Sequence, residues 1–357
     1  MSERRDLGET FRRLIAAGGP ISLMQYMGES NARYYAERSA IGAEGTGGGD
    51  FITAPEISQM FGELAGLWLA DMWARAGRPT PVHYVELGPG RGTLARDALR
   101  AMASAGLTPD VHLVETSQRM REAQRVAVPG ATHHDDLSTI PSEAPILLVA
   151  NEFLDALPVR QLVKTEAGWR EVMVGVDAGG AFIEVPGRQP MDAAIPEGRR
   201  AAPPGTVMET SPACATVVSE VADRLVRQAG AALFIDYGHA DGRSGASLQA
   251  VRGHEQVGVF DAPGEADLSA HVDFAQMVDV ARSRDCRVLG TATQGAWLRA
   301  LGIDERAEVL ANNARGHREA VMQAKERLVA PEQMGELFKV MGLAAPDWPD
   351  GAGFPAS

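Results

Sequence analysis

The spacing of apolar residues changes along the chain and separates helical regions from alternating ones. From residue 6 to 38 the pattern is helical, and a glycine-rich stretch, EGTGGGDF at 44–51, interrupts it. The segment TAPEISQMFGELAGLWLADMW then carries apolar residues at the spacing of a helix with a buried face. Thr53 and Glu56 have capping-box spacing ahead of it and Pro55 lies in the first turn, which predicts a helix start there.

Beyond residue 82, short apolar runs alternate with helical segments. The predicted strands are 82–87, 111–116, 131–136, 145–151, 232–238 and 286–292, with 338–343 as a last edge strand. The predicted helices are 93–105, 118–126 and 273–284. Repeated strand–helix units predict an α/β fold with a mostly parallel, doubly wound sheet covered by helices on both faces.

Two segments interrupt this alternation. Residues 159–187 contain three alternating runs with Gly-rich turns, which predicts an inserted antiparallel β segment, and 296–335 is predicted to be helical. We therefore expect an N-terminal helical extension and lid over 1–78. A main domain over 79–357 would follow, with insertions near 159–205, 240–270 and 296–335.

The turn after the first of these strands, within YVELGPGRGTLARDAL, places Gly88, Gly90 and Gly92 at every second position behind Glu86. A nucleoside triphosphate loop needs a lysine that this turn lacks, and the dinucleotide fingerprint needs a glycine where this chain has Thr93. Glycines let backbone N–H groups at a helix start approach a ligand carboxylate, and an acidic strand end suits an amine. S-adenosylmethionine (SAM) carries both groups. The alternative is a tight strand–helix turn that needs glycines for its own geometry.

Polar residues also follow the next strands, at the edge where open α/β sheets bind ligands. Glu115 ends the second strand, the place where a carboxylate binds ribose hydroxyls. Asp136 follows the third and either accepts from an adenine amino group or caps the following turn. Asn151, Glu152 and Asp155 follow the buried fourth strand. Two carboxylates there suit a guanidinium, which they bind bidentately, or they cap the next helical turn.

Other polar positions have two interpretations each. His133 and His134 are adjacent on a predicted strand, so they point to opposite faces, and a shared metal site is not expected. The loop 45–53 is either a lid over the cofactor or a linker. Glu56 is either a catalytic residue or a cap of its own helix. Glu209 either lines a substrate channel or caps a helix, and Asp236 and Tyr237 either line that channel or form a strand-end turn. His239 and His254 are either proton acceptors or structural histidines.

Composition narrows the class of protein. The chain has 357 residues, with 34 Lys and Arg against 47 Asp and Glu, a net charge of −13. Nucleic-acid binding relies on basic residues, so it is not expected. The two cysteines allow no disulfide framework. The sequence contains no run of about 18 apolar residues, so no membrane span is predicted. The N-terminus lacks an apolar signal core, which favours a bacterial-type cytoplasm or, with a longer precursor, a matrix-like space.

Long blocks of the sequence resemble the MidA-type methyltransferases, a family that includes the mitochondrial complex I assembly methyltransferase and its bacterial relatives. The resemblance covers about 20–355. The blocks are GDFITAPEISQMFGELAGLW, ELGPGRGTL, LVETS, ANEFLDALPVRQ, ETSPA, ALFIDYGH, SLQAVRGH, DLSAHVDF, TQGAWLRALGI and RLVAPEQMGELFKVMGL.

The resemblance implies a class I SAM-dependent methyltransferase fold and methylation of a protein arginine. In the mitochondrial branch the target is the 49-kDa subunit of NADH:ubiquinone oxidoreductase (complex I). The double-glutamate loop of other arginine methyltransferases is absent. The expected guanidinium-holding, catalytic carboxylates are Glu152, Asp155 and Glu209. The expected cofactor-binding residues are Glu86, Gly88, Pro89, Gly90, Gly92, Glu115, Thr116, Ser117, Asp136, Leu137, Asn151 and Glu152.

Three other functions fit parts of the sequence. The first is a methyltransferase that acts on a small molecule. The second is an assembly chaperone that binds SAM without turnover. The third, an NAD-dependent oxidoreductase, is disfavoured by Thr93 in place of the third fingerprint glycine.

Overall fold

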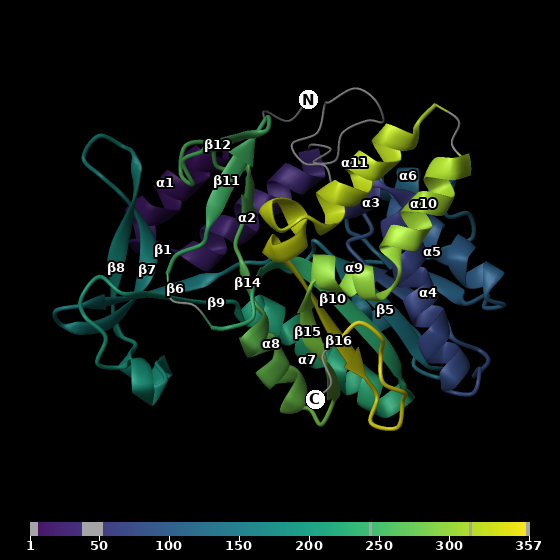
Figure 1. Ribbon diagram of the computed structural model, residues 1–357. Helices are drawn as coiled ribbons and strands as arrows, with labels where there is room; N and C mark the ends of the chain where they lie inside the picture. The colour runs from purple at the N-terminus through teal and green to yellow at the C-terminus, as the bar shows by residue number, and fades with distance from the viewer. Residues whose placement is uncertain (1–5, 38–52, 243–244, 314–315, 355–357) are drawn as a thin grey trace. The chain divides into compact units, whose positions relative to one another are not determined.

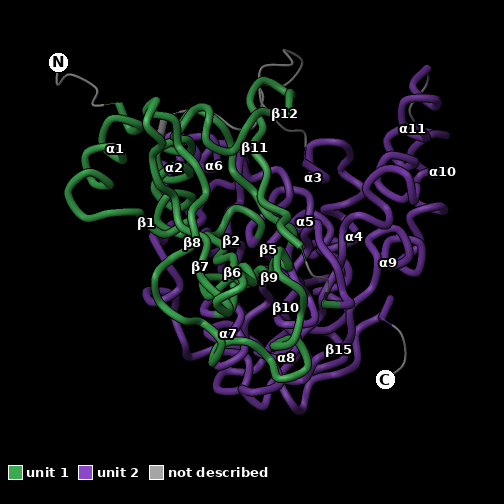
Figure 2. The backbone as a smooth tube through the Cα atoms, turned by 90° about the vertical axis from the view of Figure 1, so that its left-hand side faces the viewer, with its two compact units in different colours: residues 1–51, 155–215, 242–271 green, residues 52–154, 216–241, 272–357 purple. Residues whose placement is uncertain are grey.

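The computed structural model describes residues 6–37, 53–242, 245–313 and 316–354 (Figure 1). The expected lid at 45–53 lies outside the described residues except for Thr53. The chain divides into two compact units, each made of segments that are separate in sequence (Figure 2). Unit 1 comprises 1–51, 155–215 and 242–271, and unit 2 comprises 52–154, 216–241 and 272–357.

Unit 2 contains a mixed sheet with the strand order β15-β16-β10-β5-β2-β3-β4, and β14 pairs with β10. The strands from β10 to β4 are parallel to one another, whereas β16 is antiparallel to β15 and β10. This confirms the predicted α/β fold with a mostly parallel sheet. The strands are β2 (His83–Leu87), β3 (Asp110–Val114), β4 (Thr132–His134), β5 (Ile146–Asn151), β10 (Gly230–His239), β14 (Val272–Asp273), β15 (Arg287–Thr293) and β16 (Phe338–Ala344).

One strand lies elsewhere than its sequence suggests. The run at 338–343 was expected at an edge, but β16 hydrogen-bonds to both β15 and β10, so this expectation was wrong. Its side chains are almost all buried, as an apolar run without alternation requires of an internal strand. The edge position belongs to β15.

Helices connect and cover the strands of unit 2. The predicted helix at 53–73 is interrupted at Ser58, whose extended backbone ends one helix while its Oγ accepts from Met60 N and starts the next. Among the residues that the structure describes, no helix is long and apolar enough to cross a membrane. The helices are α3 (Ala54–Ile57), α4 (Gln59–Arg75), α5 (Thr93–Ser104), α6 (Gln118–Ala127), α7 (Pro212–Gln228), α8 (Phe274–Arg282), α9 (Gln294–Ala300), α10 (Ile303–Asn313) and α11 (Arg318–Val329).

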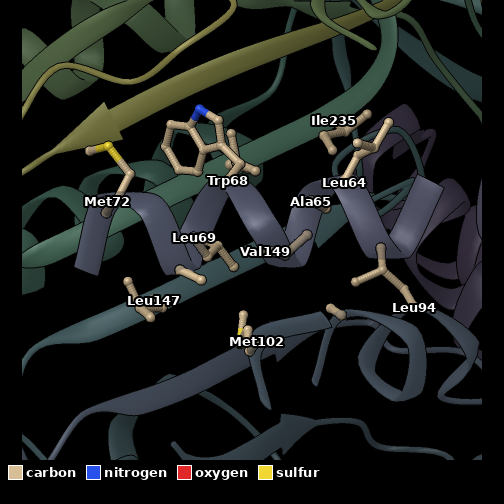
Figure 3. Close-up of a cluster of buried hydrophobic side chains, with 14 of the residues drawn as sticks. Leu64, Ala65, Trp68, Leu69, Met72, Leu94, Met102, Leu147, Val149 and Ile235 are labelled. Carbon is tan, nitrogen blue, oxygen red and sulfur yellow. The ribbon is translucent and has the colours of Figure 1, made fainter. Parts of the chain in front are cut away.

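Helices α4 and α5 pack closely because α4 has a glycine at their contact. A Cβ atom on Gly66 would lie only 2.4 Å from the carbonyl oxygen of Ala98. The predicted division at residue 78 remains a proposal, but α4 belongs to unit 2. Figure 3 shows the buried side chains around it, among them Leu64, Trp68, Leu69, Leu94, Met102 and Val149.

Unit 1 contains an antiparallel sheet with the order β1-β7-β6-β9, in which β8 pairs with β7, and a second sheet with the order β12-β11-β13. The first sheet confirms the antiparallel insertion predicted over 159–187. Its strands are β1 (Ile21–Ser22), β6 (Arg160–Thr165), β7 (Gly168–Val176), β8 (Phe182–Pro190) and β9 (Val207–Thr210). The other elements are β11 (Gln249–Arg252), β12 (Glu255–Val257), β13 (Asp267–Ser269), α1 (Leu7–Gly18) and α2 (Leu23–Glu37).

A buried asparagine joins the segments of unit 1. Asn31 on α2 donates through Nδ2 to the carbonyl oxygens of Ala156 (2.9 Å) and Leu268 (2.7 Å). Its Oδ1 accepts from Leu268 N at 3.0 Å. One side chain thus satisfies backbone groups of two segments that are more than a hundred residues apart in sequence.

The close contact of α4 and α5 predicts the effect of one added methyl group. Gly66→Ala forces the two backbones apart and should lower the free energy of unfolding by about 1–3 kcal/mol, the usual effect of overpacking. Gly18→Ala on α1 is the matched control, since a Cβ atom on Gly18 would have nothing within 4 Å. Urea unfolding of both variants checks this. Equal stabilities would contradict the close contact.

Candidate functional site

The glycine turn leaves the start of a helix open to a ligand. Gly88, Gly90 and Gly92 have φ angles of 61°, 52° and 81°, which side chains rarely adopt. Gly92 occupies the N-cap position of α5 and has no side chain to bond the first N–H groups of that helix. Those N–H groups and the helix dipole favour an anion, such as a carboxylate.

The ring of Phe153 packs against this turn. A Cβ atom on Gly88 would lie 2.8 Å from Cδ2 of Phe153. The backbone N–H groups of Phe153 and Leu154 both donate to Oδ2 of the buried Asp236, at 3.1 and 2.8 Å. Asp236 therefore fixes the turn that follows β5, which is a different turn from the one expected at the end of its own strand. A substrate-facing role for Asp236 stays a prediction. The role of Phe153 was not expected from the sequence.

Glu86 lies in the interior at the end of β2. It is 3% exposed, and its Oε2 accepts from the hydroxyl of Tyr84 at 2.5 Å. Burial raises the pKa of Glu86 to about 8, and the Tyr84 bond opposes part of that rise. A ligand ammonium beside this carboxyl would favour its charged form. Binding of the amine by Glu86 stays a prediction.

Asn151 and Glu152 form a polar pair at the carboxyl end of β5. Asn151 is 8% exposed, and its Nδ2 donates to Glu152 Oε1 at 3.2 Å. Its Oδ1 is buried and accepts no hydrogen bond in the described part of the chain. A buried acceptor without a donor is costly. An ammonium group of a bound ligand would satisfy it.

Glu152 has a strained backbone and a distant structural partner. Its φ angle is 50°, uncommon for a residue with a side chain. Its Oε1 accepts from Ala54 N at 3.0 Å, so the carboxylate caps α3 rather than the next helical turn that the sequence suggested. The segment before α4 is thereby attached to the carboxyl end of β5.

Glu115 is linked to the glycine turn through a buried glutamine. Its Oε1 accepts from Ser117 N at 2.7 Å. Gln124 on α6 donates through Nε2 to the carbonyl oxygen of Gly90 at 2.7 Å and contacts Glu115 Oε2 at 3.4 Å. Burial raises the pKa of Glu115, against the lowering effect of the Ser117 bond. The role of Gln124 was missed because its partners, Gly90 and Glu115, lie in other segments of the chain.

Asp136 caps the short 3-10 turn η1 (Leu137–Thr139). Its Oδ1 accepts from both the backbone N (2.8 Å) and the hydroxyl (2.5 Å) of Ser138, and these bonds lower its pKa. The capping interpretation is therefore correct. Both bonds use one oxygen, so an adenine contact through the other remains a proposal. Leu137 is buried, and Arg224 donates to its carbonyl oxygen.

The capping box expected at Thr53 and Glu56 is not formed. Thr53 occupies the N-cap position of α3 but makes no side-chain cap bond. The Glu56 carboxylate instead accepts from Thr93 Oγ1 at 2.6 Å. Because Thr93 is the first residue of α5, Glu56 helps to hold the glycine turn.

The other expected carboxylates belong to unit 1. The backbone carbonyl of Asp155 accepts from Ala270 N at 3.0 Å. Glu209 lies on β9, and its carboxylate accepts from Gln161 Nε2 at 2.8 Å and from the hydroxyl of Ser247. At the start of α7, Ser211 Oγ accepts from Cys214 N at 3.2 Å, so Ser211 caps that helix. Catalytic roles for Asp155 and Glu209 stay predictions.

Three further candidates, His239, His254 and Tyr237, have contacts or backbone conformations that suit a structural role. His239 Nδ1 lies 3.9 Å from Asp273 Oδ1, and His254 occupies a turn with a φ angle of 67°. Tyr237 packs its ring against Phe338. Among the residues the structure describes, no group of three or more His, Cys, Asp or Glu could hold a metal ion.

The chain is similar in sequence and in structure to known proteins. Residues 64–292 match a family described as "Putative S-adenosyl-L-methionine-dependent methyltransferase". The chain is 35% identical to the mouse (Mus musculus) and human (Homo sapiens) proteins named protein arginine methyltransferase NDUFAF7, mitochondrial. These alignments cover 92% of this chain and 82% and 81% of those relatives.

A solved structure from Burkholderia thailandensis with bound S-adenosyl-homocysteine is also similar to this chain. It has a TM-score of 0.79 and 28% identity, and the match covers 95% of this chain and 91% of that one. A native structure of a protein from the same organism has the same TM-score and 29% identity, with 97% and 95% covered.

The buried Glu86 predicts how stability depends on pH. The unfolded carboxyl ionises near 4.5 and the folded one near 8, so raising the pH between these values favours the unfolded state. Glu86→Gln removes this titration. Relative to the wild type, the variant should gain stability as the pH rises from 5 to 8.5, measured by urea unfolding. Glu122→Gln, at an exposed position on α6, is the control. A constant difference between variant and wild type would contradict the burial argument.

Proposed function

Because the chain belongs to the SAM-dependent methyltransferase family, we propose that it transfers the methyl group of SAM to an arginine guanidinium of a protein. The observation that carries the proposal is the Asn151–Glu152 pair, which combines an unsatisfied buried acceptor with a carboxylate on a strained backbone. The pair lies at the carboxyl end of β5, beside the glycine turn that follows β2. The names of the curated relatives support arginine as the acceptor.

The residues of this chain fit the parts of SAM. When bound, SAM supplies an electrophilic methyl group on a sulfonium. We assign its carboxylate to the turn at 88–92 and its amine to Asn151 Oδ1 and Glu86. We assign its ribose hydroxyls to Glu115, with Thr116 and Ser117 beside them, and its adenine to Asp136 and Leu137. The unsatisfied Asn151 Oδ1 and the φ angles of the three glycines support this placement.

The protein's contribution to the reaction is alignment and charge. A guanidinium has a pKa above about 12 and arrives protonated. Glu152, with Asp155 and Glu209 as further candidates, would hold it and localise a lone pair on one nitrogen. That nitrogen bonds to the methyl carbon as the carbon–sulfur bond breaks and its electron pair returns to sulfur. The nitrogen loses its proton during or after transfer. Holding the reacting atoms in line lowers the barrier.

The acceptor and the location are further parts of the proposal. A protein with an exposed arginine, such as the 49-kDa-type subunit of complex I during assembly, is the acceptor we propose. The curated relatives are named mitochondrial. For this chain we propose a bacterial-type cytoplasm.

The proposal is tested in an extract that lacks this protein. We expect that adding the purified chain and labelled SAM produces a methylated arginine in a protein, identified by mass spectrometry. Label in a small metabolite would replace the protein acceptor with a small-molecule one. SAM binding without any labelled product would favour a chaperone without turnover.

Glu152→Gln tests the role of the carboxylate. The amide oxygen of the substituted side chain can still accept from Ala54 N and Asn151 Nδ2, so the fold and the SAM affinity should be kept. Methyl transfer should fall about a hundredfold, the usual effect of removing one charged group aimed at a transition state. Glu122→Gln should retain full activity. Normal SAM binding with full activity in the Glu152 variant would show that this role is wrong.

A further inference from the structure

Three buried histidines form a line across neighbouring strands of unit 2. His83 on β2, His112 on β3 and His134 on β4 are 6%, 6% and 8% exposed. His112 Nε2 lies 3.1 Å from His83 Nδ1, and His112 Nδ1 lies 3.0 Å from His134 Nε2. From the sequence, His134 was considered only as a metal ligand, and the other two were not singled out. Their contact depends on strand register. His83 pairs with Asp110 and His112 with Thr132, so each histidine lies diagonally across from the next.

The line ends on the turn that follows β4. His134 Nδ1 lies 2.7 Å from Thr139 Oγ1, the last residue of η1. Asp136 caps this turn through Ser138, and the buried Leu137 begins it. Thr139 therefore connects the histidines to the segment assigned above to the adenine.

Each contact in the line is a hydrogen bond only if one hydrogen atom lies between its two heavy atoms. A neutral imidazole carries one N–H and one acceptor nitrogen. When all three rings are neutral, every contact is satisfied only if the hydrogens all point the same way along the line. One added proton makes a ring a donor from both nitrogens and fixes the direction of its neighbours. A second added proton leaves two hydrogens facing each other in one contact.

The surroundings oppose added protons at most positions. Burial and the two neighbouring histidines lower the pKa of His112 to about 4, although Asp110 acts the other way. The pKa of His134 is lowered by burial and by Arg121 on α6 and Arg224 on α7, against the opposite effects of Asp135 and Asp136. Asp110 Oδ2 lies 3.9 Å from His83 Nδ1. His112 and His134 are therefore neutral at pH 7.

We propose that the His83–His112–His134 line positions the adenine-binding turn through Thr139. The inference rests on the proposed adenine placement at Asp136 and Leu137.

Thr139→Val tests the last contact, because it removes the hydroxyl and keeps the shape. At pH 7.5 the variant should bind S-adenosylhomocysteine about fivefold more weakly, as expected for one lost hydrogen bond. Thr139→Ser should restore the affinity.

The control is Thr206→Val, which removes a comparable hydroxyl bond, to Pro203 O, in unit 1. It should bind S-adenosylhomocysteine as the wild type does at pH 7.5. Calorimetry measures the affinities, and hydrogen exchange of the Ser138 amide reports on the turn directly. A Thr139→Val protein with wild-type affinity and wild-type Ser138 exchange would overturn the inference.

Asp136→Asn, measured in parallel, separates this inference from the adenine placement. If it leaves the affinity unchanged, the adenine placement fails, and the coupling of the line to cofactor binding fails with it. If it weakens binding while Thr139→Val does not, the adenine placement stands and the positioning role of the histidines is rejected. Weaker binding in both variants, with faster Ser138 exchange in Thr139→Val, is the result we expect.

Discussion

The contact of the Phe153 ring with Gly88 is the constraint on which the arrangement of the site depends. Any side chain at position 88 would collide with that ring. The ring is in turn held in place because Asp236 on β10 accepts from the backbone of Phe153 and Leu154. Three neighbouring strands, β2, β5 and β10, are thus joined at their carboxyl ends by one glycine, one ring and one buried carboxylate.

Segments that are remote in sequence complete this frame. Glu152 accepts from the start of α3, and Glu56 at the end of α3 accepts from Thr93 at the start of α5. Helix α4 then packs on α5 through Gly66. The two carboxylates near the cofactor turn therefore have a structural role besides any chemistry. A carboxylate that caps α3 is also held at the edge where the acceptor is expected.

Sequence reasoning succeeded where the information is local. Strand–helix alternation predicts the sheet, and the glycine turn, Glu115 and Asn151 follow from the strand ends. It failed where the structure depends on contacts between residues that are far apart in the sequence. The internal place of β16, the Glu152 bond to Ala54, and the line of histidines depend on which strands become neighbours and in which register. The same limit explains the missed Gln124, whose bond to Gly90 joins α6 to a turn more than thirty residues earlier in the sequence.

We propose, above all, that the carboxyl ends of β2, β3, β4 and β5 together bind one SAM molecule. Hydrogen exchange of the whole chain, with and without S-adenosylhomocysteine, tests this binding mode directly. We expect slower exchange in 86–93, 115–117, 136–138 and 151–154, with little change in β7 and β8. Protection confined to other segments, or none at a saturating concentration of the ligand, would contradict it.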